Sequence, residues 1–288
     1  MAISDFLDHI AKEKRFSVHT QLAYKNDLES FRQFISEEFA VDLQEVSSKM
    51  VRNWFAALLE QELEPRTIRR KASALRSYYK YCIKNGELKG SPLEGLVMPK
   101  MAKRLPKFVE EKNLMAYLLE VFEAPEQEEV VQRFVVEILY STGMRLSELI
   151  ELKTKDVDLV NLQLKVTGKR NKERVIPFSL AFSETLKNYL SYRNIASEYL
   201  VCTLGGKKAY PKYIYRLVNS CLEKISTVKQ KSPHVLRHTF ATHMLNNGAE
   251  LNAIKEVLGH ANLSATEVYT HNSLEKIKLV YKQAHPRA

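Results

Sequence analysis

The sequence contains little cysteine, little tryptophan and no long apolar run. Its 288 residues include three cysteines and one tryptophan. Cys82, Cys202 and Cys221 are scattered and form no CxxC pair, so neither a disulfide framework nor a cysteine zinc site is predicted. No apolar stretch approaches bilayer length, and Asp5 and Asp8 lie where a signal peptide would be apolar. We therefore expect no membrane anchor and a reducing, cytoplasmic location.

Two kinds of ligand site are also missing from the pattern. No GxxxxGK[ST] loop is present to bind ATP. His234 and His238 are four residues apart, as in helical zinc sites, but Val235 stands where a metalloprotease has its glutamate. Arg237 would also place a cation inside the coordination shell. The sequence therefore predicts neither a metal nor a cofactor.

What the chain has in excess is positive charge. The net charge is +10 and the isoelectric point is near 9.3. Such an excess favours binding to polyanions, of which nucleic acid is the commonest. A basic protein that does not bind nucleic acid could have the same net charge. Apolar residues make up 45% of the chain, enough for real cores in one large or two ordinary domains.

The positive charge is concentrated in one segment of the first third. Acidic residues outnumber basic ones up to Glu64, whereas the segment 66–89 holds eight basic residues and one acidic residue. Apolar residues recur there at three- and four-residue steps after Pro65, which predicts an amphipathic helix with a basic stripe. Such a helix can lie against DNA phosphates, and the ordinary alternative is a solvated basic face. The residues predicted to contact DNA are Arg66, Arg69, Arg70, Arg76, Lys80 and Lys84.

The overall pattern predicts two domains, mainly α with a small β-sheet (α+β). Residues 1–97 indicate a helical DNA-binding domain, which includes a helix capped by Ser17. The stretch GSPLEGLVMPKMAKRLPK has linker composition, and we place the linker at 98–106. Residues 107–288 then form the second domain. Joined in this way, the two domains could close as a clamp around a duplex.

The second domain contains one clear strand signal among helices. Alternation at Leu162, Leu164 and Val166 predicts a strand, and residues 174–178 predict a second. The polar turn between them makes a β-hairpin with Lys169 at the entry to its loop. The rest is predicted to be helical, with Ser232 capping and Pro233 opening one helix, and Gly248 and Gly259 ending two others.

Six residues in this domain could act together on a phosphodiester. His234 and Arg237 share one face near a predicted helix start, where phosphate binds well. A phenol has a pKa near ~10, so a tyrosine nucleophile needs a base and nearby cations. Each residue taken alone could instead have a structural role, as a salt-bridge partner, a capping histidine or a core aromatic. The candidate set is Arg145, Lys169, His234, Arg237, His260 and Tyr269.

The motifs that carry these residues resemble the signature boxes of the tyrosine recombinases, the phage integrase family. They are TGMRLSEL, GKRNKER, HVLRHTFATH, LGHANLSAT and YTH, and the resemblance is greatest to the Xer-type recombinases. It implies an N-terminal core-binding (SAM-like) domain and a C-terminal catalytic domain with a docking helix. One departure is Arg170, where many relatives have glycine.

The resemblance also implies the chemistry. Tyr269 would attack the phosphate, Arg145 and Arg237 would hold its oxygens, and His234 would be the base. Lys169 would protonate the leaving 5′-oxygen and His260 would hydrogen-bond the phosphate. The implied partner is double-stranded DNA with paired half-sites, bound by a tetramer.

Several alternatives stay open at this point. The task could be chromosome-dimer resolution or the integration and excision of a mobile element. A homotetramer, assembly with a paralogous recombinase and activation by a DNA translocase all fit the sequence. A type IB topoisomerase or a non-catalytic DNA-binding regulator is the alternative function.

Overall fold

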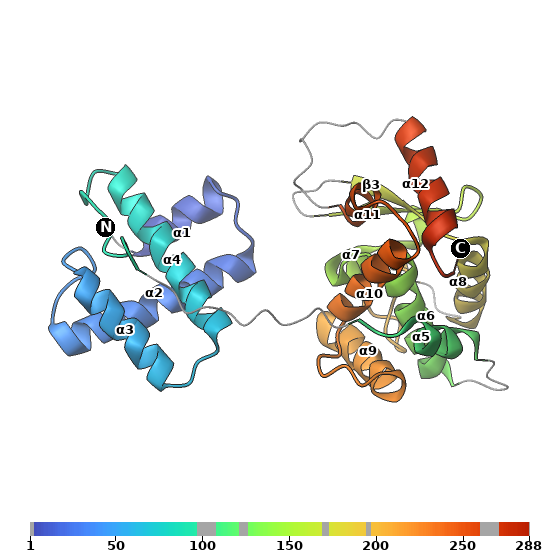
Figure 1. Ribbon diagram of the computed structural model, residues 1–288, viewed down its shortest axis with the longest axis horizontal. Helices are drawn as coiled ribbons and strands as arrows, with labels where there is room; N and C mark the ends of the chain where they lie inside the picture. The colour runs from blue at the N-terminus through green and yellow to red at the C-terminus, as the bar shows by residue number, and fades with distance from the viewer. Residues whose placement is uncertain are drawn as a thin grey trace. The chain divides into compact units, whose positions relative to one another are not determined.

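The chain folds into two compact units, Met1–Arg104 and Leu105–Ala288 (Figure 1). The computed structural model describes residues 3–96, 108–120, 126–168, 173–193, 197–259 and 271–287, with only the backbone for 271–277. The predicted linker at 98–106 and the domain limits beside it lie outside these residues, so the limits stay a prediction. The predicted fold class, mainly helical with a small sheet, is confirmed.

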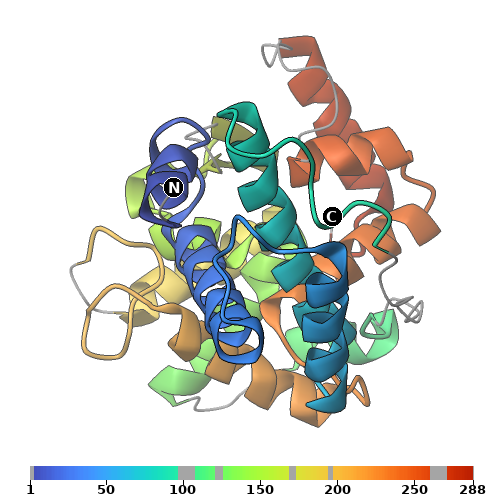
Figure 2. The ribbon, with the colours of Figure 1, turned by 90° about the vertical axis from the view of Figure 1, so that its left-hand side faces the viewer.

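The first unit is built from helices around an aromatic core. They can be followed by colour, from blue to teal, in Figure 2. The side chain of Ser17 accepts the backbone N–H of Thr20, as expected for the predicted cap. Phe31 and Trp54 pack at the centre with ring centroids 4.7 Å apart. The helices are α1 (Ile3–Lys12), α2 (Val18–Phe39), α3 (Ser48–Glu60) and α4 (Pro65–Lys84).

Helix α4 is amphipathic, as its periodicity predicts. Pro65 occupies the first helical position, where its missing N–H costs no hydrogen bond. Ile68, Leu75 and Tyr79 are buried against the other helices. Because burial fixes this face inward, the opposite face of α4 is exposed to solvent.

The second unit combines helices with a small antiparallel sheet. Its helical elements are α5 (Glu111–Leu119), α6 (Gln127–Thr142), α7 (Leu146–Glu151), the 3-10 turn η1 (Thr154–Asp156), α8 (Leu180–Arg193), α9 (Pro211–Ile225), α10 (Pro233–Asn246), α11 (Leu251–Leu258) and α12 (His271–Ala284). The strands are β1 (Val157–Asp158), β2 (Gln163–Thr167) and β3 (Glu173–Pro177), in the order β1-β2-β3.

The sheet has one strand more than the sequence predicted. The expected hairpin is present, and Thr167 of β2 pairs with Glu173 of β3 at its loop end. Strand β1 adds two residues on the other edge of β2. A two-residue strand is too short to produce a visible alternation, which explains why the sequence analysis missed it.

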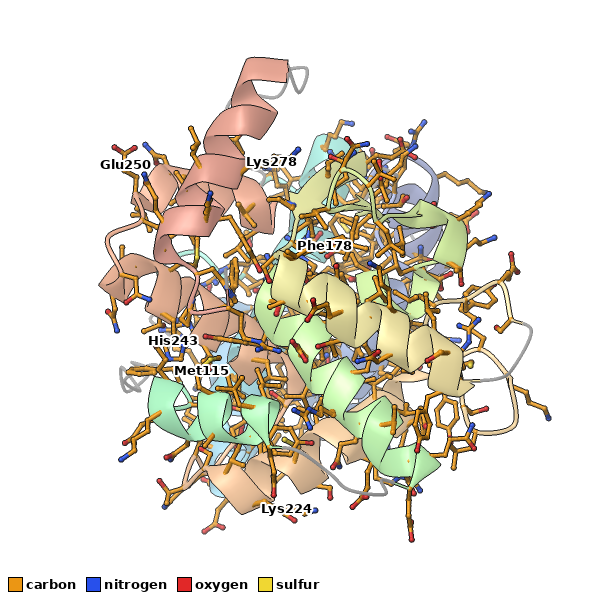
Figure 3. All side chains as sticks on the ribbon, turned by 90° about the vertical axis from the view of Figure 1, so that its right-hand side faces the viewer. Met115, Phe178, Lys224, His243, Glu250 and Lys278 are labelled. Atoms are coloured by element: carbon orange, nitrogen blue, oxygen red, sulfur yellow. The ribbon has the colours of Figure 1, made fainter. Side chains whose placement is uncertain are left out.

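Helix α6 forms the centre of this unit. It packs against α8, α9 and α10, and Figure 3 looks onto α6 and α8, which lie side by side. Phe134 of α6 stacks on Tyr189 of α8 with centroids 3.9 Å apart. On the α10 side, His243 bonds to the Tyr140 hydroxyl at 2.9 Å and to the Val109 carbonyl at 3.0 Å. His243 is therefore a buried structural histidine.

The last turns of α12 pack on their own unit. The Tyr281 hydroxyl donates to the Ser141 carbonyl at 3.0 Å, and the Tyr281 ring stacks on His285 at 4.7 Å. Arg287 pairs with the buried carboxylate of Glu137 at 2.6 Å. In the single chain, the C-terminal segment is thus held by its own unit. Across the described ranges, no helix combines the length and apolarity needed to cross a membrane.

Candidate active site

Arg145 lies immediately before helix α7 and is fixed by a carboxylate one turn later. Its backbone N–H donates to Glu148 at 2.7 Å, and its guanidinium donates to the same carboxylate at 2.8 Å. A further guanidinium N–H reaches the carbonyl of Gly259 at 3.1 Å. About a third of the Arg145 side chain remains accessible, at 34%. The guanidinium is therefore both oriented and within reach of a ligand.

Arg237 lies in the second turn of α10 and is held by two backbone carbonyls. Its guanidinium donates to Gly143 at 2.5 Å and to Leu258 at 2.7 Å. Gly143 ends α6 in the left-handed conformation, with φ of 58°. The bond therefore links the break before Arg145 to helix α10. The structure brings Arg145 and Arg237 to adjacent carbonyls, although they are far apart in sequence.

A third guanidinium, from Arg174 on β3, completes this cluster. It donates to both oxygens of Glu148, at 2.7 and 2.8 Å, and its Nε donates to the carbonyl of Val257 at 3.1 Å. The sequence analysis missed Arg174. Strand alternation places Arg174 on the same face of β3 as Ile176, but only the structure shows that both are buried and that Arg174 bonds to Glu148.

The three guanidiniums meet at the end of α11. They donate to three consecutive carbonyls, Val257, Leu258 and Gly259, so each bonds one group near the helix C-terminus. The helix dipole places partial negative charge there, which suits cations. Figure 1 shows α11 beside β3. Residue 260 follows directly, so the cluster lies at the start of the segment that carries His260 and Tyr269.

Burial and charge perturb the groups of this cluster. Burial raises the pKa of Glu148, but hydrogen bonds and charge from Arg174 and hydrogen bonds from Arg145 outweigh it and lower the pKa to about 2. Burial, with the charges of Arg145 and Arg174, lowers the pKa of Arg237 to about 10. Glu148 therefore stays ionised and Arg237 stays cationic at neutral pH. Among the described residues, the three guanidiniums lie near one carboxylate, Glu148, which bonds to two of them, so the cluster has an excess of positive charge that suits a phosphate.

His234 stands near the N-terminus of α10, one turn before Arg237. Its side chain is exposed, and Pro233 begins the helix as predicted. Ser232 occupies the cap position, but its side chain makes no capping bond, so that expectation is wrong. The hydroxyl of Ser232 is buried, and it has no hydrogen-bond partner among the described residues.

Three of the six predicted site residues cannot be placed. Lys169, His260 and Tyr269 lie outside the described residues. Their described neighbours are informative: β2 and β3 flank the loop of Lys169, and Gly259 precedes His260. The described part of the chain thus brings Arg145 and Arg237 together and puts His234 on the helix of Arg237.

The predicted DNA-contacting stripe on α4 is exposed, but one member has a structural partner. Arg70 donates to the buried carboxylate of Asp27 and to the Ala23 carbonyl, and Lys71 lies 3.3 Å from the same carboxylate. Because Asp27 is 1% exposed, this ion pair helps to join α2 and α4. The other predicted residues, all exposed, are Arg66, Arg69, Arg76, Lys80 and Lys84.

Comparison with known proteins is consistent over nearly the whole chain. Residues 107–276 match the phage integrase family, and residues 3–86 match the phage integrase N-terminal SAM-like domain. Tyrosine recombinase XerC of Chlorobaculum tepidum is 36% identical over 318 residues, which cover 99% of this chain and 94% of that one. Tyrosine recombinase XerC of Staphylococcus carnosus is 38% identical over 287 residues, with 98% and 96% covered.

Solved structures share the fold. The XerH site-specific recombinase bound to palindromic difH substrate has a TM-score of 0.73 at 21% identity, covering 99% of this chain and 82% of that one. The Tn1549 transposon integrase in complex with transposon right end DNA has a TM-score of 0.72 at 17% identity, with 96% and 98% covered. With both domain models matched and XerC relatives similar end to end, the chain belongs to the phage integrase family and is a tyrosine recombinase.

Proposed function

We propose that this protein is a site-specific DNA recombinase that cuts and rejoins DNA through a 3′-phosphotyrosine intermediate. Tyr269 supplies the nucleophilic oxygen. Arg145 and Arg237 hold the non-bridging oxygens of the scissile phosphate, and His260 donates a hydrogen bond to it. His234 and Lys169 move the protons.

The bonds made and broken balance without another reactant. The Tyr269 hydroxyl attacks phosphorus, its proton passes to His234, and the bond from phosphorus to the 5′-oxygen breaks. Lys169 protonates that oxygen, which leaves as a free 5′-hydroxyl. Rejoining is the reverse reaction with a 5′-hydroxyl as nucleophile, so the phosphotyrosine conserves the bond and ATP is not required. Catalysis then rests on positioning and on charge stabilisation.

One observation carries the proposal: Arg145 and Arg237 are held side by side at the end of α11. Their guanidiniums donate to Gly259 and Leu258 at 3.1 and 2.7 Å. Two fixed cationic forks next to each other match the paired oxygens of a phosphate. The segment with His260 and Tyr269 starts at the residue after Gly259, so the proposed nucleophile is ten residues along the chain from the carbonyl that holds Arg145.

The proposed assembly is supported by likeness to relatives that bind DNA. XerH and the Tn1549 integrase are described bound to their own DNA. By likeness to them, two protomers bind inverted half-sites of a duplex and a tetramer exchanges the strands. The SAM-like unit would bind the duplex through the α4 stripe, with its basic side chains against phosphates. A topoisomerase or a non-catalytic regulator is not favoured, because the relatives that match end to end are recombinases.

Trapping the covalent intermediate on genomic DNA tests this function. The protein is incubated with fragmented DNA of its source, denatured and recovered with the DNA ends attached to it, which are then sequenced. We expect a few defined sites with protein on the 3′ end. Tyr269→Phe should give no adduct while still binding DNA, and Tyr215→Phe, at an exposed tyrosine of α9, is the matched control. A wild-type protein without an adduct, or with adducts at random positions, would contradict the proposal.

A further inference from the structure

Arg174 is a charged residue without a role in the reaction described above. It is 6% exposed, so it cannot reach DNA without leaving the core. Its guanidinium donates to both oxygens of Glu148 and to the carbonyl of Val257. Burying a cation costs free energy unless it is well paired, and here each of the three guanidinium nitrogens donates to a partner. Because burial of the Arg174 guanidinium costs free energy, we expect this side chain to have a role, which its contacts indicate.

The three bonds of Arg174 join three elements that lead to site residues. Strand β3, which carries Arg174, closes the hairpin whose loop contains Lys169. Glu148 lies on α7 and orients Arg145. Val257 is at the end of α11, just before the segment of His260. One guanidinium therefore ties the hairpin, the α7 start and the α11 end to each other.

The carboxylate between the two arginines has no freedom left. One oxygen of Glu148 receives Arg145 at 2.8 Å and Arg174 at 2.7 Å. The other receives Arg174 at 2.8 Å and the backbone N–H of Arg145 at 2.7 Å. Four donors fix its rotamer, and two of the four come from Arg174. If Arg174 were lost, Glu148 could rotate, and the Arg145 guanidinium could rotate with it.

Close packing at the end of α11 adds to this restraint. A Cβ on Gly259 would lie 3.1 Å from the Cδ and 3.2 Å from the Nε of Arg174. The guanidinium therefore lies directly against the Gly259 backbone, whose carbonyl accepts Arg145. The position of that carbonyl thus depends on Arg174 both through contact and through the Val257 bond.

We propose that Arg174 is a positioning residue, which aims Arg145 at the scissile phosphate by fixing Glu148 and the end of α11. The proposal rests on the proposed function. Arg174 itself does not touch the DNA. Its planar fork is needed, because the single ammonium of a lysine cannot bond both Glu148 oxygens and the Val257 carbonyl in this geometry.

The test uses Arg174→Lys in the full-length protein, with Arg193→Lys as the matched control. Arg193 is also buried, at 8% exposure, and donates to the carbonyls of Tyr199 and Leu200 at 2.7 and 2.8 Å. These bonds are at the end of α8 and involve none of the site residues. Each variant replaces a buried arginine by lysine, but of the two arginines only Arg174 is bonded to Glu148.

Three quantities are measured well below each melting temperature: the DNA dissociation constant, the melting temperature and the single-turnover rate of adduct formation. For Arg174→Lys we expect adduct formation to slow by about 10²-fold, the loss typical of a misplaced reacting group, with DNA affinity within about threefold of wild type. Arg193→Lys should keep the wild-type rate. An equal rate in both variants would overturn the proposal.

A double-variant cycle separates positioning from a general structural effect. If Arg174 acts through Arg145, adding Arg174→Lys to Arg145→Ala should lower the rate by no more than about threefold further. A further loss as large as that in the single variant would overturn the proposal. If Arg174→Lys fails to fold, Arg174→Met with Glu148→Leu replaces the ion pair by apolar side chains of similar volume, and the same slow adduct formation is expected. A wild-type rate in that variant would likewise contradict it.

Adduct formation by the wild-type protein separates a failure of the proposed function from a failure of the proposed role of Arg174. Without an adduct in the wild type, the proposed function falls, and this inference falls with it. A wild-type adduct combined with unimpaired Arg174 variants overturns only the positioning role of Arg174.

Discussion

Gly143→Ala should damage both the stability of the catalytic unit and the site. Gly143 has a φ of 58°, and a Cβ there would lie 2.6 Å from the Cδ1 of Phe240 and 2.8 Å from the Cδ2 of Leu258. Phe240 is fully buried, so it has little room to give way. The carbonyls of Gly143 and Leu258 both accept Arg237, so a shift of either moves that guanidinium.

The magnitude has two parts. A side chain in the left-handed region costs about 1–2 kcal/mol. Overpacking of a filled core adds about 1–3 kcal/mol. The free energy of unfolding should therefore fall by about 2–5 kcal/mol. For a domain of this size, each kcal/mol shifts the melting temperature by about 2–4 °C.

Substitutions at two other glycines of the same unit separate the backbone strain from the overpacking. Gly248 also has a positive φ, of 87°, but nothing lies within 4 Å of its Cβ position, so Gly248→Ala should cost only the backbone strain. Gly205 has open space and no positive φ, so Gly205→Ala should be neutral or slightly stabilising. Among the three variants, Gly143→Ala should have the lowest melting temperature in thermal unfolding. An equal loss for Gly143→Ala and Gly248→Ala would refute the steric argument.

Two further predictions concern the surface of α4 and the C-terminal segment. Arg76→Ala or Lys80→Ala should weaken DNA binding and lower its salt slope by about 0.9, without a change in melting temperature, whereas Arg70→Ala should lower the melting temperature because Asp27 loses a partner. Binding titrations over a salt series and thermal unfolding check both, and an unchanged slope for Arg76→Ala would count against the stripe. Burial, with the charges of His243 and Arg287, lowers the pKa of His285 to about 3, so the folded state prefers its neutral form. The stability from His285 is complete above its unfolded pKa of about 6.5 and is lost by about 1.4 kcal/mol per pH unit below it, down towards 3. His285→Phe should flatten this decline in thermal unfolding between pH 7.5 and 5, and an equally steep decline in the variant would refute the assignment.

Local sequence signals predicted the regular elements well where each signal is strong by itself. Pro65 and a long 3.6-residue period defined α4, and Ser17 marked the start of α2. Alternation predicted the hairpin. Helix α6 begins at Gln127, before its first buried apolar residue, Val131, and its first turn is acidic and not fully buried. Such a turn has no apolar period to detect.

The sequence predicted which residues form the candidate site, but it did not predict the contacts that hold them together. Glu148 is three residues after Arg145, a spacing that lets side chains meet on a helix, and the structure shows this contact. The shared use of the α11 carbonyls and the role of Arg174 depend on contacts between residues far apart in sequence, which no local pattern encodes. Arg70 shows the same limit. It fits the basic stripe, yet only the fold places the buried Asp27 beside it.

Identification of the residue that carries the DNA tests the central claim most directly. The trapped adduct is digested with nuclease and protease, and the peptide that retains a nucleotide is located by mass spectrometry. The account predicts one modified peptide, with the nucleotide on Tyr269 through its 3′-phosphate. A nucleotide on any other residue, or on Tyr269 through a 5′-phosphate, would contradict it.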